Sequence, residues 1–254
     1  ECGYCEHRCP SRDLTLTPRR RIVVRRALTG LQAAGQQREY NELLSQYQYD
    51  GLDTCAVDGL CAGACPVDIN TGDLVKRLRR ENHSAGANKL ALQAARYFGK
   101  LQWAARSALT TGNALNKIFG KKTMPRMTGL LKRLMPSFPL WTDELSAPPS
   151  LKTLRKQSRT SRVADTPAVV YFSSCISRMM GGGQKGKKSI LDTFLNVSEK
   201  AGIAVVVSKP LLSGCCGQIF SSKGYTQAYR HTAAQVVAQL WEATDGGRIP
   251  VVMD

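Results

Sequence analysis

Apolar side chains recur at helical spacing through the first half of the chain. This pattern predicts helices over residues 18–36, 38–48 and about 72–83, the last preceded by an Asn-Thr-Gly-Asp cap. The apolar positions of the first two helices are Ile22, Val23, Ala27, Leu28, Leu31, Tyr40, Leu43, Leu44 and Tyr47. Residues 87–120 carry almost no strand signal and predict one or two helices, and residues 123–135 add a short basic helix.

The pattern changes after residue 165, where strands and helices begin to alternate. The predicted elements are strand 168–174, a glycine-rich loop, helix 187–201, strand 203–208, a cysteine-containing loop, helix 221–243 and strand 249–253. Such alternation is typical of an α/β arrangement with a parallel sheet. The predicted fold class is therefore mainly α, followed by an α/β parallel-sheet domain that is incomplete at the C-terminus.

Composition supports a folded chain with a linker near its middle. The sequence has 254 residues, and 43% of them are apolar, which excludes a disordered chain. No run of eighteen apolar residues is present, so no membrane-spanning segment is predicted. The composition of residues 151–165 predicts an exposed linker. It would join two helical segments, 1–84 and 85–150, to the α/β domain 166–254. Because the chain opens without Met and stops on a predicted strand, we expect it to be a piece of a longer protein.

The charge is strongly basic and unevenly placed. Lys and Arg total 36 against 19 Asp and Glu, a formal net charge of +17. Glu81 is the one acidic residue among fourteen Lys and Arg between positions 74 and 135. Solvated helix faces are the simplest interpretation. An anionic membrane surface, an acidic partner domain or steering of a dicarboxylate substrate are the alternatives. Nucleic-acid binding is not expected, because no recognition motif accompanies the charge.

The first cysteine run points to an iron–sulfur cluster. Cys2-x2-Cys5-x3-Cys9-Pro10 is the tail of the run C-x2-C-x2-C-x3-C-P, which ligates four-iron, four-sulfur clusters. The first cysteine of that run would stand three residues before Cys2, outside the sequence. Short spacers let one loop supply several thiolates to a single cluster.

A second run follows the same template with one departure. Cys55-x5-Cys61-x3-Cys65-Pro66 has Asp58 where the second cysteine should stand. An aspartate there leaves two alternatives, a carboxylate ligand on the fourth iron or a three-iron cluster with that position vacant.

Two such runs in one chain predict a two-cluster, ferredoxin-like module. In that arrangement the fourth cysteine of each run serves the other cluster. One cluster would take Cys2, Cys5, Cys65 and an upstream cysteine, and the other would take Cys55, Cys61, Cys9 and, as a candidate, Asp58. Structural zinc is less favoured, because zinc motifs come as complete CxxC pairs and His7 fits no zinc spacing. Disulfides would not explain the two Cys-Pro endings.

A third group of cysteines lies in the predicted α/β half. Cys175 follows one predicted strand, and Cys215-Cys216-Gly217 follows the next. Loops after parallel strands open at the same carboxyl edge of a sheet, so the three thiols could converge on a metal or redox centre. Buried free cysteines and a catalytic thiol–disulfide pair are the alternatives. The nearby segment 181–188 resembles a P-loop, but Lys188 replaces the required hydroxyl, and nucleotide binding is not predicted.

Three stretches of the chain carry a family resemblance. They are ECGYCEHRCPSRDLTLTPRRRIVVRR, YDGLDTCAVDGLCAGACPVDINTGDLVK and SGCCGQIFSSKGY. Together they resemble the iron–sulfur half of the large FAD-linked D-2-hydroxyacid dehydrogenases, which include bacterial D-2-hydroxyglutarate and D-lactate dehydrogenases. The C-terminal half resembles the cysteine-rich CCG domain of heterodisulfide reductases and of the iron–sulfur subunits of glycolate oxidase and glycerol-3-phosphate dehydrogenase.

The resemblance implies an activity and its partners. An upstream FAD domain of the same polypeptide would oxidise a D-2-hydroxy acid, with D-2-hydroxyglutarate as the first expectation and D-lactate as an alternative. Hydride would pass to the flavin, and 4Fe-4S clusters would carry single electrons to a quinone or another carrier. A separate iron–sulfur subunit of a glycolate oxidase or glycerol-3-phosphate dehydrogenase is the competing expectation. The implied location is cytoplasmic, with peripheral contact to the inner face of the membrane and homo-oligomerisation as further expectations.

Overall fold

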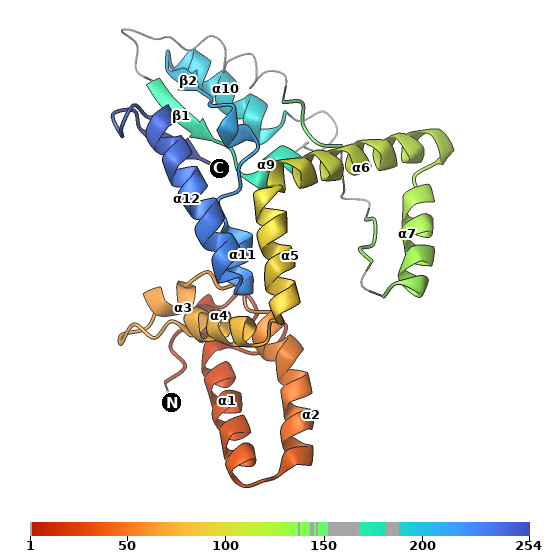
Figure 1. The fold of residues 1–254 in the computed structure, drawn as a ribbon, viewed down its shortest axis with the longest axis vertical. Helices are drawn as coiled ribbons and strands as arrows, with labels where there is room; N and C mark the ends of the chain where they lie inside the picture. The colour runs from red at the N-terminus through yellow and green to blue at the C-terminus, as the bar shows by residue number, and fades with distance from the viewer. Residues whose placement is uncertain (1, 137, 143–144, 146, 152–167, 181–187) are drawn as a thin grey trace. The chain divides into compact units, whose positions relative to one another are not determined.

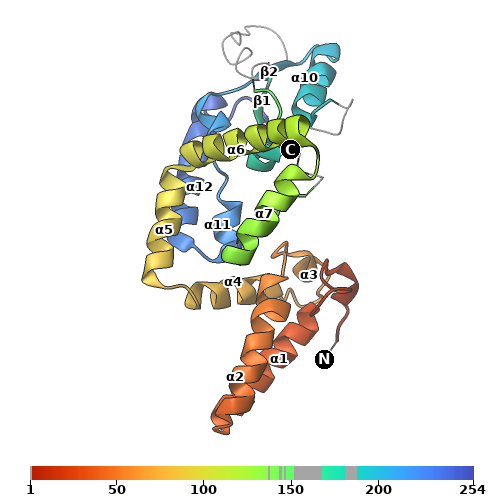
Figure 2. The same ribbon diagram turned by 90° about the vertical axis from the view of Figure 1, so that its right-hand side faces the viewer.

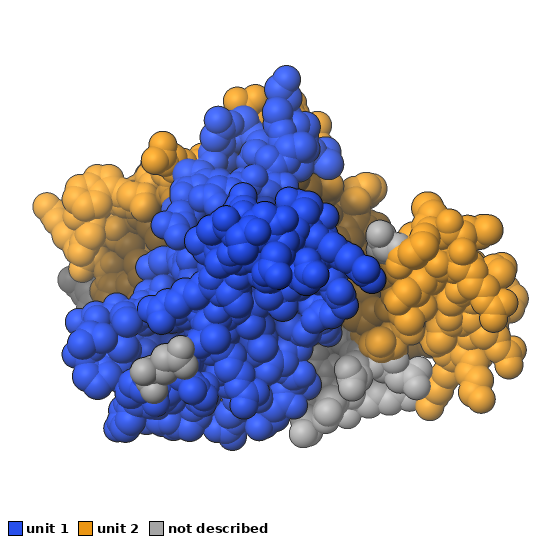
Figure 3. Space-filling model, turned by 90° about the horizontal axis from the view of Figure 1, so that it is seen from below, with its two compact units in different colours: residues 1–92, 218–229 blue, residues 93–217, 230–254 orange. Residues whose placement is uncertain are grey.

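The computed structural model describes residues 2–136, 138–142, 145, 147–151, 168–180 and 188–254. The chain divides into two compact units (Figure 3). Unit 1 comprises residues 1–92 and 218–229, and unit 2 comprises residues 93–217 and 230–254. Most of linker 151–165 and the glycine-rich segment 181–187 lie outside the described residues, and the domain boundaries predicted at 84 and 150 stay predictions.

Unit 1 is helical, as the sequence predicts (Figure 1). Its elements are the 3-10 turn η1 (Glu6–Arg8), α1 (Pro18–Ala33), α2 (Gln37–Tyr47), the π-helical turn η2 (Gln48–Asp53), α3 (Leu60–Gly63), α4 (Thr71–Glu81), part of α5 (Ala85–Arg96), α11 (Gln218–Lys223) and the start of α12 (Thr226–Ala243). Helices α1 and α2 lie side by side as a hairpin (Figure 1). The Asn70 side chain accepts a hydrogen bond from the Gly72 backbone N–H at 3.0 Å, which confirms the predicted cap of α4.

The core of unit 1 lies where α1, α2, η2 and α4 meet. Its buried members are Leu28, Tyr47, Leu52, Val57, Val75 and Leu78. The inward face of α1 differs from the predicted one, because Val23 and Ala27 are exposed whereas Arg21 is buried. Arg21 and Leu28 lie seven positions apart and therefore share one helix face. The partners of the Arg21 side chain, described below, explain why that face turns inward.

Unit 2 begins with the end of α5 and the helices α6 (Phe98–Phe119) and α7 (Thr123–Leu134). Region 87–120 is thus two helices, and α7 leaves the end of α6 at an angle (Figure 2). A Cβ atom at Gly112 would stand 2.5 Å from the Trp141 ring, so glycine is needed for this close contact. Among the described residues, no helix is both long and apolar enough to cross a membrane.

The remainder of unit 2 is a small parallel sheet between helices. Strands β1 (Ala168–Phe172), β2 (Ala204–Val206) and β3 (Val251–Met253) pair in the order β2-β1-β3, both pairs parallel. Tyr171 packs with the core that includes α10 (Ile190–Lys200), and Val170 and Phe172 pack with Val236 of α12. Alternate side chains of β1 therefore face opposite layers. The fold class predicted from the sequence, mainly α followed by α/β, is confirmed.

Two short elements differ from the sequence prediction. Helix α9 (Cys175–Met180) follows β1 directly, where a loop was expected. The single helix expected over 221–243 is instead α11 and α12, separated at Gly224. Gly224 has φ +86°, and a Cβ atom there would stand 2.8 Å from the Arg80 backbone nitrogen. The chain breaks here because the turn approaches the backbone of α4 closely and in a conformation that glycine tolerates best.

Candidate iron–sulfur site

The first cysteine run lies on a loop that is fastened to the start of α1. Glu6 Oε1 accepts hydrogen bonds from Thr17 Oγ1 at 2.6 Å and from Arg19 Nε at 3.0 Å. These bonds hold the pKa of the Glu6 carboxyl below its ordinary value. Gly3 has φ +77°, which permits the tight turn between Cys2 and Cys5. The loop is therefore held in place before any cofactor is considered.

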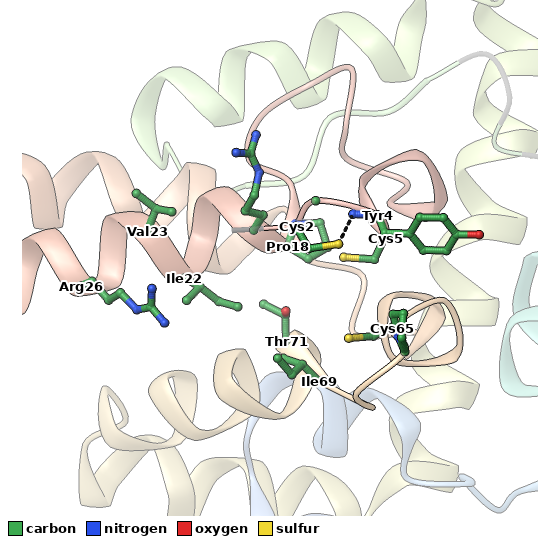
Figure 4. Close-up of a pocket in the computed structure, with 13 residues that line it drawn as sticks. Cys2, Tyr4, Cys5, Pro18, Ile22, Val23, Arg26, Cys65, Ile69 and Thr71 are labelled. Carbon is green, nitrogen blue, oxygen red and sulfur yellow. Dashed lines mark hydrogen bonds between the residues drawn. The ribbon is translucent and has the colours of Figure 1, made fainter.

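Cysteines from both runs line one cavity. Cys2, Cys5 and Cys65 border a space of about 220 Å³ between this loop, α1 and the segment leading into α4 (Figure 4). Other lining residues include Pro18, Ile22, Ile69 and Thr71. The structure thus brings together the three residues that the crosswise pattern of a two-cluster module assigns to one cluster.

The sulfurs of this set are in surroundings suited to thiolate ligands. The Tyr4 backbone N–H donates to Cys2 Sγ at 3.4 Å, and Cys2 is exposed (Figure 4). Burial raises the pKa of the Cys5 thiol, and the nearby Cys61 and Cys65 raise it further. The thiolate form of Cys5 is thus disfavoured by the protein alone, and bound iron would stabilise it by supplying positive charge.

Two members of the second set, Cys9 and Cys55, lie close to Arg21 of α1. Cys9 Sγ lies 3.2 Å from Ser11 Oγ and 3.6 Å from Arg21 Nη1, which donates to it. Cys9 is also close enough to Cys55 to raise the pKa of that thiol, although burial is the larger cause. Cys9 therefore lies beside a cysteine of the other run, again as the crosswise pattern predicts.

The other two members of the second set differ in exposure. Cys61 is buried on α3, with its Sγ 3.9 Å from Asn70 Oδ1. Asp58 is exposed, and its Oδ1 accepts a hydrogen bond from the Leu60 backbone N–H at 3.1 Å. This carboxylate thus binds the N–H of the first residue of α3, and its role as an iron ligand stays a prediction.

The arrangement does not suit a single metal ion. Within the described part of the chain, no three His, Cys, Asp or Glu side chains are grouped closely enough to hold one ion. His7 is exposed and makes an edge contact with the Tyr4 ring. In a cubane each thiolate binds a different iron, so the sulfurs stand further apart than the four ligands of zinc. The spacing of the two cysteine runs remains the ground for preferring a cluster to zinc.

The cysteines of the α/β half also meet. The Cys215 thiol is hydrogen-bonded to the thiols of Cys175 and Cys216, and it accepts the Gly217 backbone N–H at 3.4 Å. The bond from Cys215 lowers the pKa of Cys175 to about 7, whereas the pKa of Cys215 is raised by the same bonds and by burial. The two loops do open at one edge of the sheet, and a metal at this trio stays a prediction.

Buried arginines are the functional candidates that the sequence does not reveal. Arg21, Arg79 and Arg178 are 1%, 6% and 0% exposed. Arg178 donates to the backbone carbonyls of Leu211 and Gly214, and so fixes the loop that leads to Cys215. Arg79 falls in the basic stretch for which solvated helix faces are the simplest interpretation, and that interpretation is wrong for this residue. Arginine in a basic run gives no signal of burial, because burial depends on carbonyls contributed by distant loops.

A comparison with known proteins supports the assignment of the N-terminal cysteine runs to iron–sulfur clusters. Residues 1–69 match the family described as the 4Fe-4S dicluster domain. No curated protein and no solved structure matches the chain. The N-terminal part of the chain is accordingly an iron–sulfur, ferredoxin-like module with an electron-transfer role, consistent with a component of an oxidoreductase.

Proposed function

We propose that the chain is the electron-transfer part of an FAD-dependent dehydrogenase that oxidises a D-2-hydroxy acid. The proposed substrate is D-2-hydroxyglutarate, and the product is 2-oxoglutarate. The observation that carries the electron-transfer part is the cavity shared by Cys2, Cys5 and Cys65, because it joins the two cysteine runs at one site. The flavin and the substrate class rest on the resemblance of the three motif stretches.

The residues of the chain would hold two clusters side by side. Cys2, Cys5 and Cys65 would bind one of them, and Cys9, Cys55 and Cys61 the other, with Asp58 as a candidate ligand. When bound, a 4Fe-4S cluster supplies one-electron transfer, which links a two-electron flavin to a one-electron carrier. The protein's part is to fix the sulfurs, to donate N–H groups to them and to set the charge around them. The CCG thiols would form a further redox or metal centre.

A substrate screen tests the proposal. The full-length protein is purified anaerobically and assayed with a dye acceptor on D-2-hydroxyglutarate, D-lactate, glycolate and glycerol-3-phosphate. We expect the highest kcat/KM with D-2-hydroxyglutarate and no turnover of L-2-hydroxyglutarate. A higher kcat/KM with D-lactate would identify D-lactate as the substrate and leave the proposed dehydrogenase family unchanged. Turnover of glycolate or glycerol-3-phosphate alone, or of none of the four, would contradict the proposal.

A further inference from the structure

Two buried arginine side chains, Arg21 of α1 and Arg79 of α4, lie beside Cys9 and Cys55 of the second set of cysteines. Arg21 donates from Nε to the Gly51 carbonyl at 2.7 Å and from Nη2 to Ser11 Oγ at 2.8 Å. Its Nη1 donates to Cys9 Sγ at 3.6 Å. All three nitrogens of this guanidinium are thus hydrogen-bonded, one of them to a sulfur.

Arg79 approaches the same region from α4. Its Nη2 donates to the Cys55 carbonyl at 2.9 Å and also to the Leu52 carbonyl, and its Nη1 donates to the Ser222 carbonyl. Its Nε is buried without a hydrogen-bond partner. The bonds to Leu52 and Cys55 fix the backbone at the end of η2 and at Cys55.

Among the described residues, neither guanidinium forms an ion pair with a carboxylate, although the Asp53 carboxylate lies close enough to favour the charged form of Arg79. Burial lowers the pKa of Arg79, which reflects the cost of removing its charge from water. Two buried cations that lie this close to each other are unfavourable unless an anion accompanies them.

Besides the Asp53 carboxylate, the nearby groups that could become anionic include the thiols of Cys9 and Cys55. Arg21 Nη1 donates to Cys9 Sγ at 3.6 Å, and Arg79 Nη2 donates to the backbone carbonyl of Cys55 at 2.9 Å. A cluster bound by thiolates would place negative charge at this position. Reduction adds a further negative charge, which a fixed buried cation stabilises.

The first set of cysteines has different surroundings. Cys2 is exposed, and Arg19 beside this set forms an ion pair with Glu6 at 3.0 Å. Arg26, which also lines the cavity, is exposed, so water screens its charge. Net positive charge is therefore better retained at the second set than at the first.

We propose that Arg21 and Arg79 are the counter-charges of the cluster held by Cys9, Cys55 and Cys61, and that they raise its reduction potential above that of the other cluster. The proposal rests on the iron–sulfur function proposed above. It sets the direction of transfer, because electrons move from the cluster of lower potential to the cluster of higher potential.

Redox titration of the full-length protein, followed by electron paramagnetic resonance, tests the proposal. Arg21→Gln and Arg21→Met remove the charge with a polar and an apolar side chain, and Arg20→Gln is the matched control at an exposed position of the same helix. The relevant signal is the one that Cys55→Ser removes. We expect this signal to have the higher midpoint potential in the wild type. In the Arg21 variants the midpoint potential of this cluster should fall. At the wild-type midpoint its reduced-to-oxidised ratio should be about tenfold lower, which corresponds to a shift of about 59 mV for one electron.

The other midpoint should stay unchanged, and Arg20→Gln should change neither. An unchanged or raised midpoint in either Arg21 variant would overturn the proposal, as would an equal shift in Arg20→Gln. If neither variant binds the cluster, the proposal is tested on wild-type protein labelled with ¹⁵N-arginine. Pulsed resonance should then detect a weak ¹⁵N coupling in this signal, and its absence would contradict the proposal. A wild type without iron–sulfur signals would refute the proposed function itself.

Discussion

At the scale of single residues, sulfur and guanidinium groups define the site. The amide of Tyr4 and the side chain of Arg21 each donate to a cysteine sulfur, and Glu6 ties the first loop to α1. N–H donors stabilise negative charge on sulfur, and their number is one of the factors that set cluster potential. The cysteine spacing predicts which sulfurs meet, but not which donors surround them.

Tyr47 connects this site to the core of unit 1. Its Oη donates to the Arg21 carbonyl at 3.2 Å, and burial raises the pKa of its phenol above 10. Tyr47→Phe should lower the free energy of unfolding by about 1 kcal/mol at pH 8, because the Arg21 carbonyl loses a buried partner. Tyr49→Phe, at a position 64% exposed, should change it little.

The effect of Tyr47→Phe should depend on alkaline pH. The unfolded tyrosine ionises from about pH 10, whereas the folded tyrosine resists ionisation to a higher pH. The wild type therefore loses stability relative to the Phe variant as the pH rises from 10 through the folded pKa. Guanidinium unfolding midpoints at pH 8, 9, 10 and 11 measure the difference. A gap that stays constant or widens above pH 10 would show that the phenol is not buried in this way.

At the scale of elements, η2 determines how closely α1 and α2 pack. Gly51 of η2 lies under the Tyr47 ring, where an added Cβ atom would stand 2.3 Å from the ring carbon Cε2. The Gly51 carbonyl also accepts the 2.7 Å bond from Arg21 Nε. A side chain at this position would push apart the ring and the turn that holds the arginine.

Gly51→Ala should therefore destabilise unit 1 by about 1–3 kcal/mol through overpacking. Gly30→Ala is the matched control, because Gly30 lies within α1 and a Cβ there would meet no atom within 4 Å. Alanine at that helical position should stabilise by about 0.5–1 kcal/mol. Thermal unfolding of both variants gives the comparison. Equal shifts in Tm of the same sign would show that Gly51 is not sterically constrained.

The elements also show how far the sequence predicts the structure. Helical periodicity locates α1, α2, α4 and α7, and alternation of strands and helices predicts the parallel sheet. The orientation of α1 was not predictable, because it depends on the burial of Arg21 against carbonyls of η2. The break at Gly224 was not predictable either, since it arises from contact with the backbone of α4, far away in the sequence.

At the scale of the whole molecule, the chain joins an iron–sulfur module to a parallel-sheet region with its own thiol trio. The first is supported by motif spacing, by geometry and by the family match over residues 1–69. The second is supported by the meeting of Cys175, Cys215 and Cys216 at one sheet edge. Three of the residues behind the net charge of +17, Arg21, Arg79 and Arg178, are buried rather than solvated.

The central claim is that two clusters are bound crosswise by the two cysteine runs. Iron and acid-labile sulfide, measured on anaerobically purified full-length protein, test it most directly when the wild type is compared with Cys65→Ser. The wild type should contain about eight irons in the module, or slightly fewer if Asp58 leaves one position vacant, and Cys65→Ser should lose about four. Ala64→Ser, which introduces the same side chain one position earlier, should lose none. Zinc without acid-labile sulfide, or a Cys65→Ser protein with undiminished iron, would contradict the account.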